Sequence, residues 1–150
     1  MSHSVWTAYE KNSPQTWPTA SRGSVRSKIW PLPESFFLVY GRKVGARKNG
    51  YHKALCLENG MFCWPLDHVV AWSRGPVFPD GSNESGFRVL WNRRDSQVPS
   101  SAVDVLVLCK FMTGKLHWTV SRYDSASNSW SAEKNGISVV FWADIPPFTY

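Results

Sequence analysis

Two short stretches share one pattern of apolar and polar positions, and the other segments of the chain fall into order around them. The first covers residues 68–73 and is followed by Pro76, and the second covers residues 138–143 and is followed by Pro146. Each contains two valines, an apolar residue, a tryptophan and a small residue. Such residues favour strands, and proline ends a strand because it has no N–H to donate. The pattern predicts two buried strands, each closing one half of the chain.

The segments that precede these two strands repeat in the same order. In the second half we expect strands at 87–91, 103–109, 116–123, around Trp130 and at 137–143. In the first half, residues 36–40 match 105–109, residues 51–57 match 116–123, and Trp64 matches Trp130. No segment shows a sustained period of 3.6 residues, so little helix is expected. We predict a mainly β chain, with α+β as the alternative, built as a tandem duplication of two similar antiparallel units.

The turn-forming residues set the expected boundaries of these units. Residues 79–86 are rich in Gly, Ser, Asn and Asp, which predicts a first unit at 1–80, a linker at 81–86 and a second unit at 87–150. Residues 15–32 have no counterpart in the second half, and their Pro, Gly and Ser content indicates an inserted loop. Residues 41–50 lie between two expected strands and predict a glycine-rich hairpin tip.

Composition narrows the class of protein. The chain has 150 residues, of which 43% are hydrophobic and nine are Trp, more Trp than a small core is expected to hide. An odd number of cysteines, three, fits a reducing compartment better than a disulfide framework. No apolar run is long enough to cross a membrane, and no apolar leader segment follows Met1. We therefore expect a cytoplasmic protein.

The positive charge is concentrated in the first third. Residues 1–53 carry nine Lys/Arg and two Asp/Glu, a net charge of +7, whereas residues 54–150 carry eight and nine, a net charge of −1. This asymmetry predicts an anionic macromolecular partner, either a host protein or nucleoprotein complex or the phosphates of RNA or DNA. The expected contact residues are Arg22, Arg26, Lys28, Arg42, Lys43, Arg47, Lys48, Lys53, Tyr51, Trp17 and Trp30.

The basic tip and the two tryptophans also have a purely structural interpretation. The basic tip is equally typical of a solvated hairpin that keeps a protein soluble. Tyr51 has the chemistry to stack on a base. Trp17 and Trp30 fit either anchors at a partner surface or covers for an open sheet edge. Sequence-specific readout of DNA or RNA is not supported, because nothing in the chain resembles a helix-turn-helix, an RRM or a zinc-finger pattern.

Metal and catalytic chemistry have little support in the sequence. His52, Cys56, Cys63 and His68 are potential zinc ligands, but they form no Cys-x2-Cys pair, and the second half has Tyr123, Ser129 and Ser138 at or beside matching positions. Asp80 is not followed by the Asp/Glu-x-Lys of a metal-dependent nuclease, and no nucleophile or phosphate-loop motif occurs. We expect neither metal nor cofactor, and no enzymatic activity.

The second half resembles a small domain family of unknown function found mostly in phage and prophage genes. The matching positions are Trp91, Pro99, 105–107, Trp130, 139–140, Trp142 and 146–147. The first half follows the same pattern loosely, through Trp6, Pro14, 37–39, Trp64, 68–70, Trp72 and Pro76. The family's acidic turn after the first proline and its methionine after the last tryptophan are missing here. The resemblance implies a phage origin and supplies no catalytic residues.

Together these features predict a non-enzymatic, phage-encoded binding protein that inhibits a host defence or nucleic-acid-handling complex, as anti-CRISPR proteins do. Direct, non-specific binding of nucleic acid or nucleotide is the alternative, and a metal-dependent nuclease is the third hypothesis. The inhibitor hypothesis depends on the resemblance and on the charge distribution, since no motif identifies a target.

Overall fold

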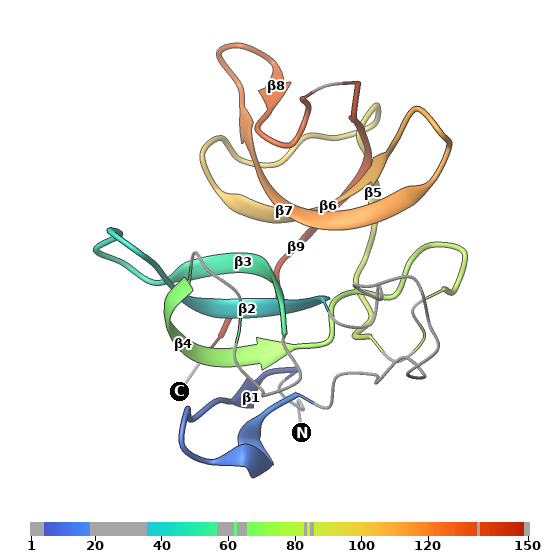
Figure 1. Cartoon of the computed structure of the whole chain (residues 1–150). Helices are drawn as coiled ribbons and strands as arrows, with labels where there is room; N and C mark the ends of the chain where they lie inside the picture. Colours follow the sequence, from blue (N-terminus) through green and yellow to red (C-terminus); the bar gives the residue numbers. More distant parts are fainter. Residues whose placement is uncertain are drawn as a thin grey trace. The chain divides into compact units, whose positions relative to one another are not determined.

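The computed structural model describes residues 5–18, 36–56, 62, 66–82, 84, 86–134 and 136–148. These residues form two antiparallel sheets, one of four strands and one of five (Figure 1). The helical content of the described residues is one short 3-10 turn, η1 (Pro14–Thr16). The prediction of a mainly β chain with two tandem antiparallel units is therefore confirmed.

The chain divides into two compact units. The first comprises Met1–Gly75 with Phe148–Tyr150, and the second comprises Pro76–Pro147. This division lies before the linker that we predicted at 81–86. The reason is local: Pro76 bridges to Phe87, and the N–H of Val77 donates to the carbonyl of Phe87 at 2.8 Å. The chain between them turns back within the second unit.

The first unit is a four-stranded sheet in the order β1-β4-β2-β3. Its strands are β1 (Thr7–Ala8), β2 (Phe36–Lys43), β3 (Gly50–Leu55) and β4 (Leu66–Ser73). The second unit has the order β5-β9-β6-β7-β8. Its strands are β5 (Asn92–Arg93), β6 (Asp104–Lys110), β7 (Leu116–Asp124), β8 (Ser129–Trp130) and β9 (Ser138–Asp144). The first four strands of each order correspond, so the two units share one arrangement of four strands.

The pairing register corrects the sequence-based matching of the two halves. Val39 lies opposite Trp72, and Val107 lies opposite Trp142, so Val39 corresponds to Val107. Matching 36–40 to 105–109 placed Val39 on Leu108, one residue too far. A slip of one residue moves a side chain to the other face of a sheet. Counting along the chain misses such a slip when the turns between strands differ in length.

A second correction concerns the strand that carries Trp130. Trp130 lies opposite Tyr123, and in the first unit the equivalent bridge joins Cys56 to Phe62. The counterpart of Trp130 is therefore Phe62, whereas we had matched Trp64, which lies outside the described residues. The sequence could not separate the two because both are large aromatic residues in one short segment.

Both units contain the same β-bulge. In the first unit the register shifts between Tyr40 and Gly41, so that Gly41 pairs with Val69. In the second unit it shifts between Leu108 and Cys109, so that Cys109 pairs with Val139. One extra residue on the partner strand bends the ladder at this point. Val69 and Val139 are consequently equivalent positions.

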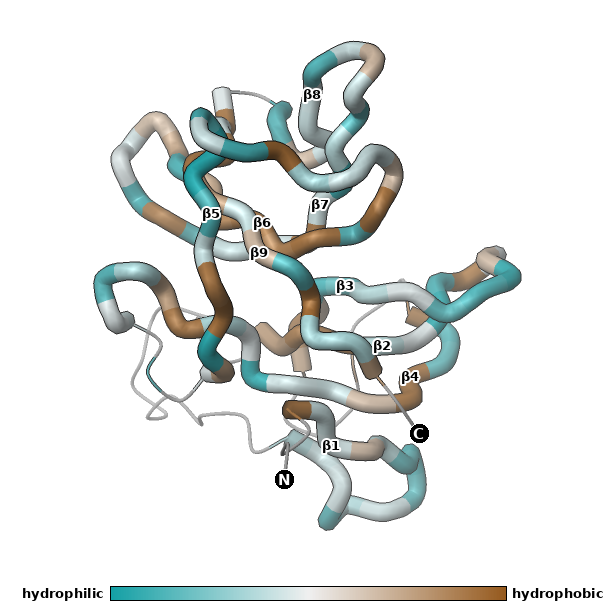
Figure 2. The backbone as a smooth tube through the Cα atoms, turned by 180° about the vertical axis from the view of Figure 1, so that it is seen from behind, coloured by the Kyte–Doolittle hydropathy of each residue, from teal (hydrophilic) through white to brown (hydrophobic). Residues whose placement is uncertain are grey.

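Each unit has a core on one face of its sheet. The buried residues of the first core are Phe37, Val39, Ala54, Cys56 and Trp72. Those of the second are Val105, Val107, Cys109, Tyr123, Trp130, Val139 and Trp142. The two predicted Trp strands thus supply core residues. Figure 2 shows hydrophobic stretches of chain in both sheets, interrupted by hydrophilic loops.

The matched tryptophans are held by the same kind of hydrogen bond. The indole N–H of Trp72 donates to the carbonyl of Thr16, and that of Trp142 donates to the carbonyl of Gln97, both at 2.8 Å. Each acceptor belongs to the segment between the first short strand of its unit and the next strand. The bond satisfies a buried donor and fixes that segment to the core.

Candidate partner-binding surface

The basic hairpin tip is the loop that joins β2 to β3. The chain turns where the N–H of Ala46 donates to the carbonyl of Lys43 at 3.0 Å, and Gly45 has a φ of 83°, a conformation that favours glycine. Lys43, Arg47 and Lys48, which we call the tip cations, are exposed. The loop projects beyond the strands of its own sheet (Figure 1), and it is largely hydrophilic in Figure 2.

Arg42 lies at the base of this loop and has a partner within the unit. Its guanidinium lies 3.6 Å from the carboxylate of Asp67, and the two side chains are 41% and 56% exposed. An ion pair this open to water contributes little stability. In the part of the chain that the structure describes, no ion pair involves the tip cations, so their charge is available to a partner.

Lys53 and Tyr51 lie on β3 and face their own unit. The ammonium of Lys53 lies 4.9 Å from the centre of the Phe36 ring, a cation–π contact. The Tyr51 ring packs against Trp6, and its hydroxyl accepts a hydrogen bond from the N–H of Phe148 at 3.0 Å. Tyr51 is thus part of an internal aromatic cluster, a role that differs from the base-stacking we expected.

Trp17 follows η1 and is half-buried. Its indole N–H donates to the carbonyl of Glu10 at 3.0 Å, which ties the ring to its own segment. The remaining candidates of the inserted loop, Arg22, Arg26, Lys28 and Trp30, lie outside the described residues. Within the described residues, the predicted contact residues that lie together and exposed are the tip cations.

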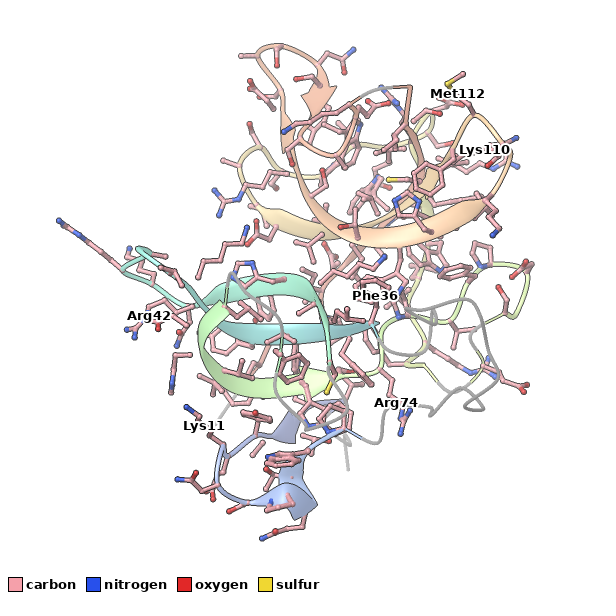
Figure 3. All side chains as sticks on the ribbon, viewed as in Figure 1. Lys11, Phe36, Arg42, Arg74, Lys110 and Met112 are labelled. Atoms are coloured by element: carbon pink, nitrogen blue, oxygen red, sulfur yellow. The ribbon has the colours of Figure 1, made fainter. Side chains whose placement is uncertain are left out.

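A cavity lies beside the base of the hairpin, at the start of β4. It has a volume of about 380 Å³, and its lining includes Tyr9, Lys11, Leu66 and Asp67 (Lys11 is labelled in Figure 3). Burial, and then the charge of Cys56, raise the pKa of the Tyr9 hydroxyl, which remains a neutral donor at physiological pH. Sequence reasoning missed this cavity because Tyr9 and Lys11 are not part of any recognisable motif.

The second unit has a smaller cavity, of about 290 Å³, lined in part by Arg122, Ser131 and Trp130. Its polar groups are used internally. The guanidinium of Arg122 donates to the carboxylate of Asp104 at 2.6 Å, and this bond raises the pKa of Arg122. The main-chain N–H of Arg122 donates to the hydroxyl of Ser131 at 3.0 Å. Such groups organise the hairpin around β7 and β8.

Two of the residues considered for metal binding and catalysis have structural roles, Cys56 in the first core and Asp80 in hydrogen bonds with Ser82. No group of three or more His, Cys, Asp or Glu side chains suited to a metal occurs among the described residues, and Cys63 lies outside them. Cys56 is buried in the first core. The Asp80 carboxylate accepts from the hydroxyl of Ser82 at 2.6 Å and from its N–H at 2.9 Å, and these bonds lower the pKa of Asp80.

None of the helical structure in the described residues is long and apolar enough to span a membrane. Comparison of the chain with family models, with curated proteins and with solved structures found no match. The resemblance to a phage domain family therefore stays a prediction, and functional argument depends on the surface described above.

Proposed function

We propose that this chain is a non-enzymatic, phage-encoded binding protein that inhibits a host defence or nucleic-acid-handling complex. The observation that supports this most directly is the projecting β2–β3 loop with its exposed tip cations, Lys43, Arg47 and Lys48. A concentrated positive field on a projecting loop speeds encounter with an acidic surface and sets the orientation of docking. In this proposal the tip enters an acidic groove of the host complex.

A protein target is favoured over free nucleic acid by the composition of the tip. Proteins that bind single strands without sequence preference combine cations with aromatic rings on which bases stack. The tip has no aromatic residue, and Tyr51, the nearest one on β3, packs against Trp6. Three cations that bind phosphates alone would give weak and steeply salt-dependent affinity. Direct nucleic-acid binding therefore remains the second candidate.

The first experiment is a pull-down of the tagged protein from host lysate, with and without nuclease treatment. We expect one host complex to be recovered under both conditions. The test variant is Arg47→Glu with Lys48→Glu, which should reduce recovery by about tenfold or more, since two favourable charge contacts become repulsive. The matched control is Arg88→Glu with Lys134→Glu, which changes the charge by the same amount at two exposed positions of the second unit.

The outcomes separate the hypotheses. Equal recovery with the test variant and the control would contradict a role for the tip. Recovery that disappears after nuclease treatment, together with binding of labelled RNA or DNA, would replace the inhibitor proposal by direct nucleic-acid binding. Magnesium-dependent cleavage of labelled DNA, lost in Asp80→Asn, would instead support the nuclease hypothesis.

A further inference from the structure

The cavity beside β4 can be compared with the equivalent place in the second unit. The main-chain N–H of Tyr9 donates to the carbonyl of Val70 at 3.0 Å, and that of Arg94 donates to the carbonyl of Val140 at 3.1 Å. Tyr9 and Arg94 therefore occupy the same position relative to their sheets. Val69 precedes Val70 on β4, and Val139 precedes Val140 on β9. The shared bulge makes Val69 and Val139 equivalent positions.

In the second unit, two side chains cover the edge of β9 at this point. The carboxylate of Glu133 accepts from the N–H of Val139 at 3.3 Å, and the guanidinium of Arg94 donates to the carbonyl of Val139 at 3.4 Å. Glu133 and Arg94 also form an ion pair with each other. The N–H and the carbonyl of Val139 are thus both satisfied by side chains, a carboxylate and a guanidinium, which leaves no unpaired main-chain group at this residue of the strand edge.

At the matching sequence positions of the first unit there is neither an arginine nor a carboxylate. Tyr9 stands in place of Arg94, and residues 62–66 contain no Asp or Glu. Within the described part of the chain, no side chain hydrogen-bonds to the main chain of Val69. The 380 Å³ cavity opens here, with Val69 and Leu66 of β4 along one side and Lys11 in its lining.

We propose that this cavity binds an extended segment of a partner polypeptide, which adds to the outer edge of β4 at Leu66–Val69 and places a carboxylate where the second unit has that of Glu133. Among the described residues, β1 pairs with β4 at Trp72 and Ala71, and the hydrogen bond from Tyr9 to Val70 extends this pairing by one residue, so an added strand would continue the line of β1. Addition of a strand to a sheet edge is a common mode of peptide recognition, in which main-chain bonds give affinity and side-chain pockets give selectivity.

The lining of the cavity selects the kind of segment. Leu66 and Val69 offer apolar contact, and the volume of the cavity is at the lower end of the range for ligand pockets. The exposed ammonium of Lys11 favours an acidic side chain on the segment. Asp67 and Glu10 also line the cavity, but the carboxylate of Asp67 is paired with Arg42 and that of Glu10 accepts a hydrogen bond from the hydroxyl of Ser13. The preferred ligand is a short, extended peptide with alternating β-branched residues around one acidic residue.

This inference does not depend on the proposed function, because it uses the geometry of β4 and the comparison with β9 alone. The ion pair between Asp67 and Arg42 places the cavity next to the hairpin tip, so one partner can occupy both. The two proposals can fail separately: the tip variants test the host complex, and the peptide experiment below tests the cavity.

The probe is a peptide of sequence Thr-Val-Glu-Val-Thr, acetylated and amidated, titrated into the isotope-labelled full chain and followed by the amide signals of the protein. We expect saturable shifts centred on Leu66, His68 and Val69. Replacing the glutamate of the probe by glutamine should weaken binding by about threefold to fivefold, the loss of one exposed charge contact. Methylating its inward amide nitrogens should weaken binding by about tenfold, because main-chain hydrogen bonds are lost.

A pair of protein variants locates the site. Lys11→Glu should weaken binding of the acidic probe by about fivefold. Arg74→Glu changes an exposed residue of the same unit by the same charge, just past the end of β4 and away from Lys11 (Figure 3), and should leave binding unchanged. Three results would overturn the proposal: no saturable shift at β4, equal binding of the methylated probe, or the same shifts with free glutamate alone.

Discussion

The two hairpin tips show how the duplicated units differ. The loop between β2 and β3 carries the exposed tip cations and one exposed large apolar side chain, Val44. The equivalent segment, from the end of β6 to the first residue of β7, has three exposed large apolar side chains, Phe111, Met112 and Leu116. A hairpin tip contributes little to the core, so it can change chemistry while the strands beneath it keep their order. Function is therefore to be sought where the two copies disagree.

The bulge shows a difference of the opposite kind, in which the backbone is kept and the side chain changes. Gly41 and Cys109 hold the same position after the register shift. A Cβ added to Gly41 would lie 2.3 Å from the carbonyl oxygen of His68, far inside contact distance. Cys109 is buried in the second core, so the same position there holds a side chain. The first unit therefore has a tighter bulge than the second.

The largest predicted effect follows from this difference. Gly41→Ala should lower the free energy of unfolding by about 2–3 kcal/mol, because a backbone atom has to move to admit the methyl group. Cys109→Ala should cost about 1 kcal/mol, since it removes one buried sulfur and leaves the bulge in place. Denaturant unfolding of both variants measures the two losses. Equal losses would mean that the bulges are equally tight.

Much of the fold could be predicted from the sequence because strand periodicity and turn residues are local signals. The strand around Trp142 and the turn before it follow from adjacent residues. The register did not follow, since the match of Val39 to Val107 depends on which residues hydrogen-bond across the sheet. The unit boundary was also missed, because the bridge from Pro76 to Phe87 joins residues that no local pattern connects.

The candidate surface was predictable only in part, for a related reason. Charge can be counted along the chain, so Arg47 and Lys48 were found. The contact of Tyr51 with Trp6 was not predicted, because it joins residues far apart in the sequence. The cavity at β4 became visible only when the second unit showed what Arg94 does at the position of Tyr9.

The second prediction tests the side chains that cover β9. Glu133→Gln keeps the shape of the side chain but removes its charge, and it should cost about 1–2 kcal/mol because Arg94 and the N–H of Val139 lose a charged acceptor. Glu10→Gln is the control in the first unit, where the carboxylate accepts one exposed bond from Ser13. It should change stability by less than about 0.5 kcal/mol. If Glu133→Gln left the free energy of unfolding unchanged, the bonds of Glu133 at the edge of β9 would not contribute to stability.

The smallest predicted effect concerns the alkaline stability of the first unit alone. Burial, followed by the charge of Cys56, raises the pKa of Tyr9 above its ordinary value of 10.0. In the unfolded chain the hydroxyl loses its proton near that value, whereas the folded state holds it to higher pH. Stability from this group is complete below about pH 10 and is lost as pH rises through the folded pKa.

Tyr9→Phe removes this titration, so the difference in melting temperature between the native chain and the variant should shift in favour of the variant between about pH 9 and 11. Its value at pH 7 is the reference, which accounts for other contacts of the hydroxyl. The shift should correspond to a fraction of one proton, because the ring is half-buried. If the difference in melting temperature did not change with pH, the Tyr9 hydroxyl would be exposed to water. One distinction between the edges of β4 and β9 would then be removed.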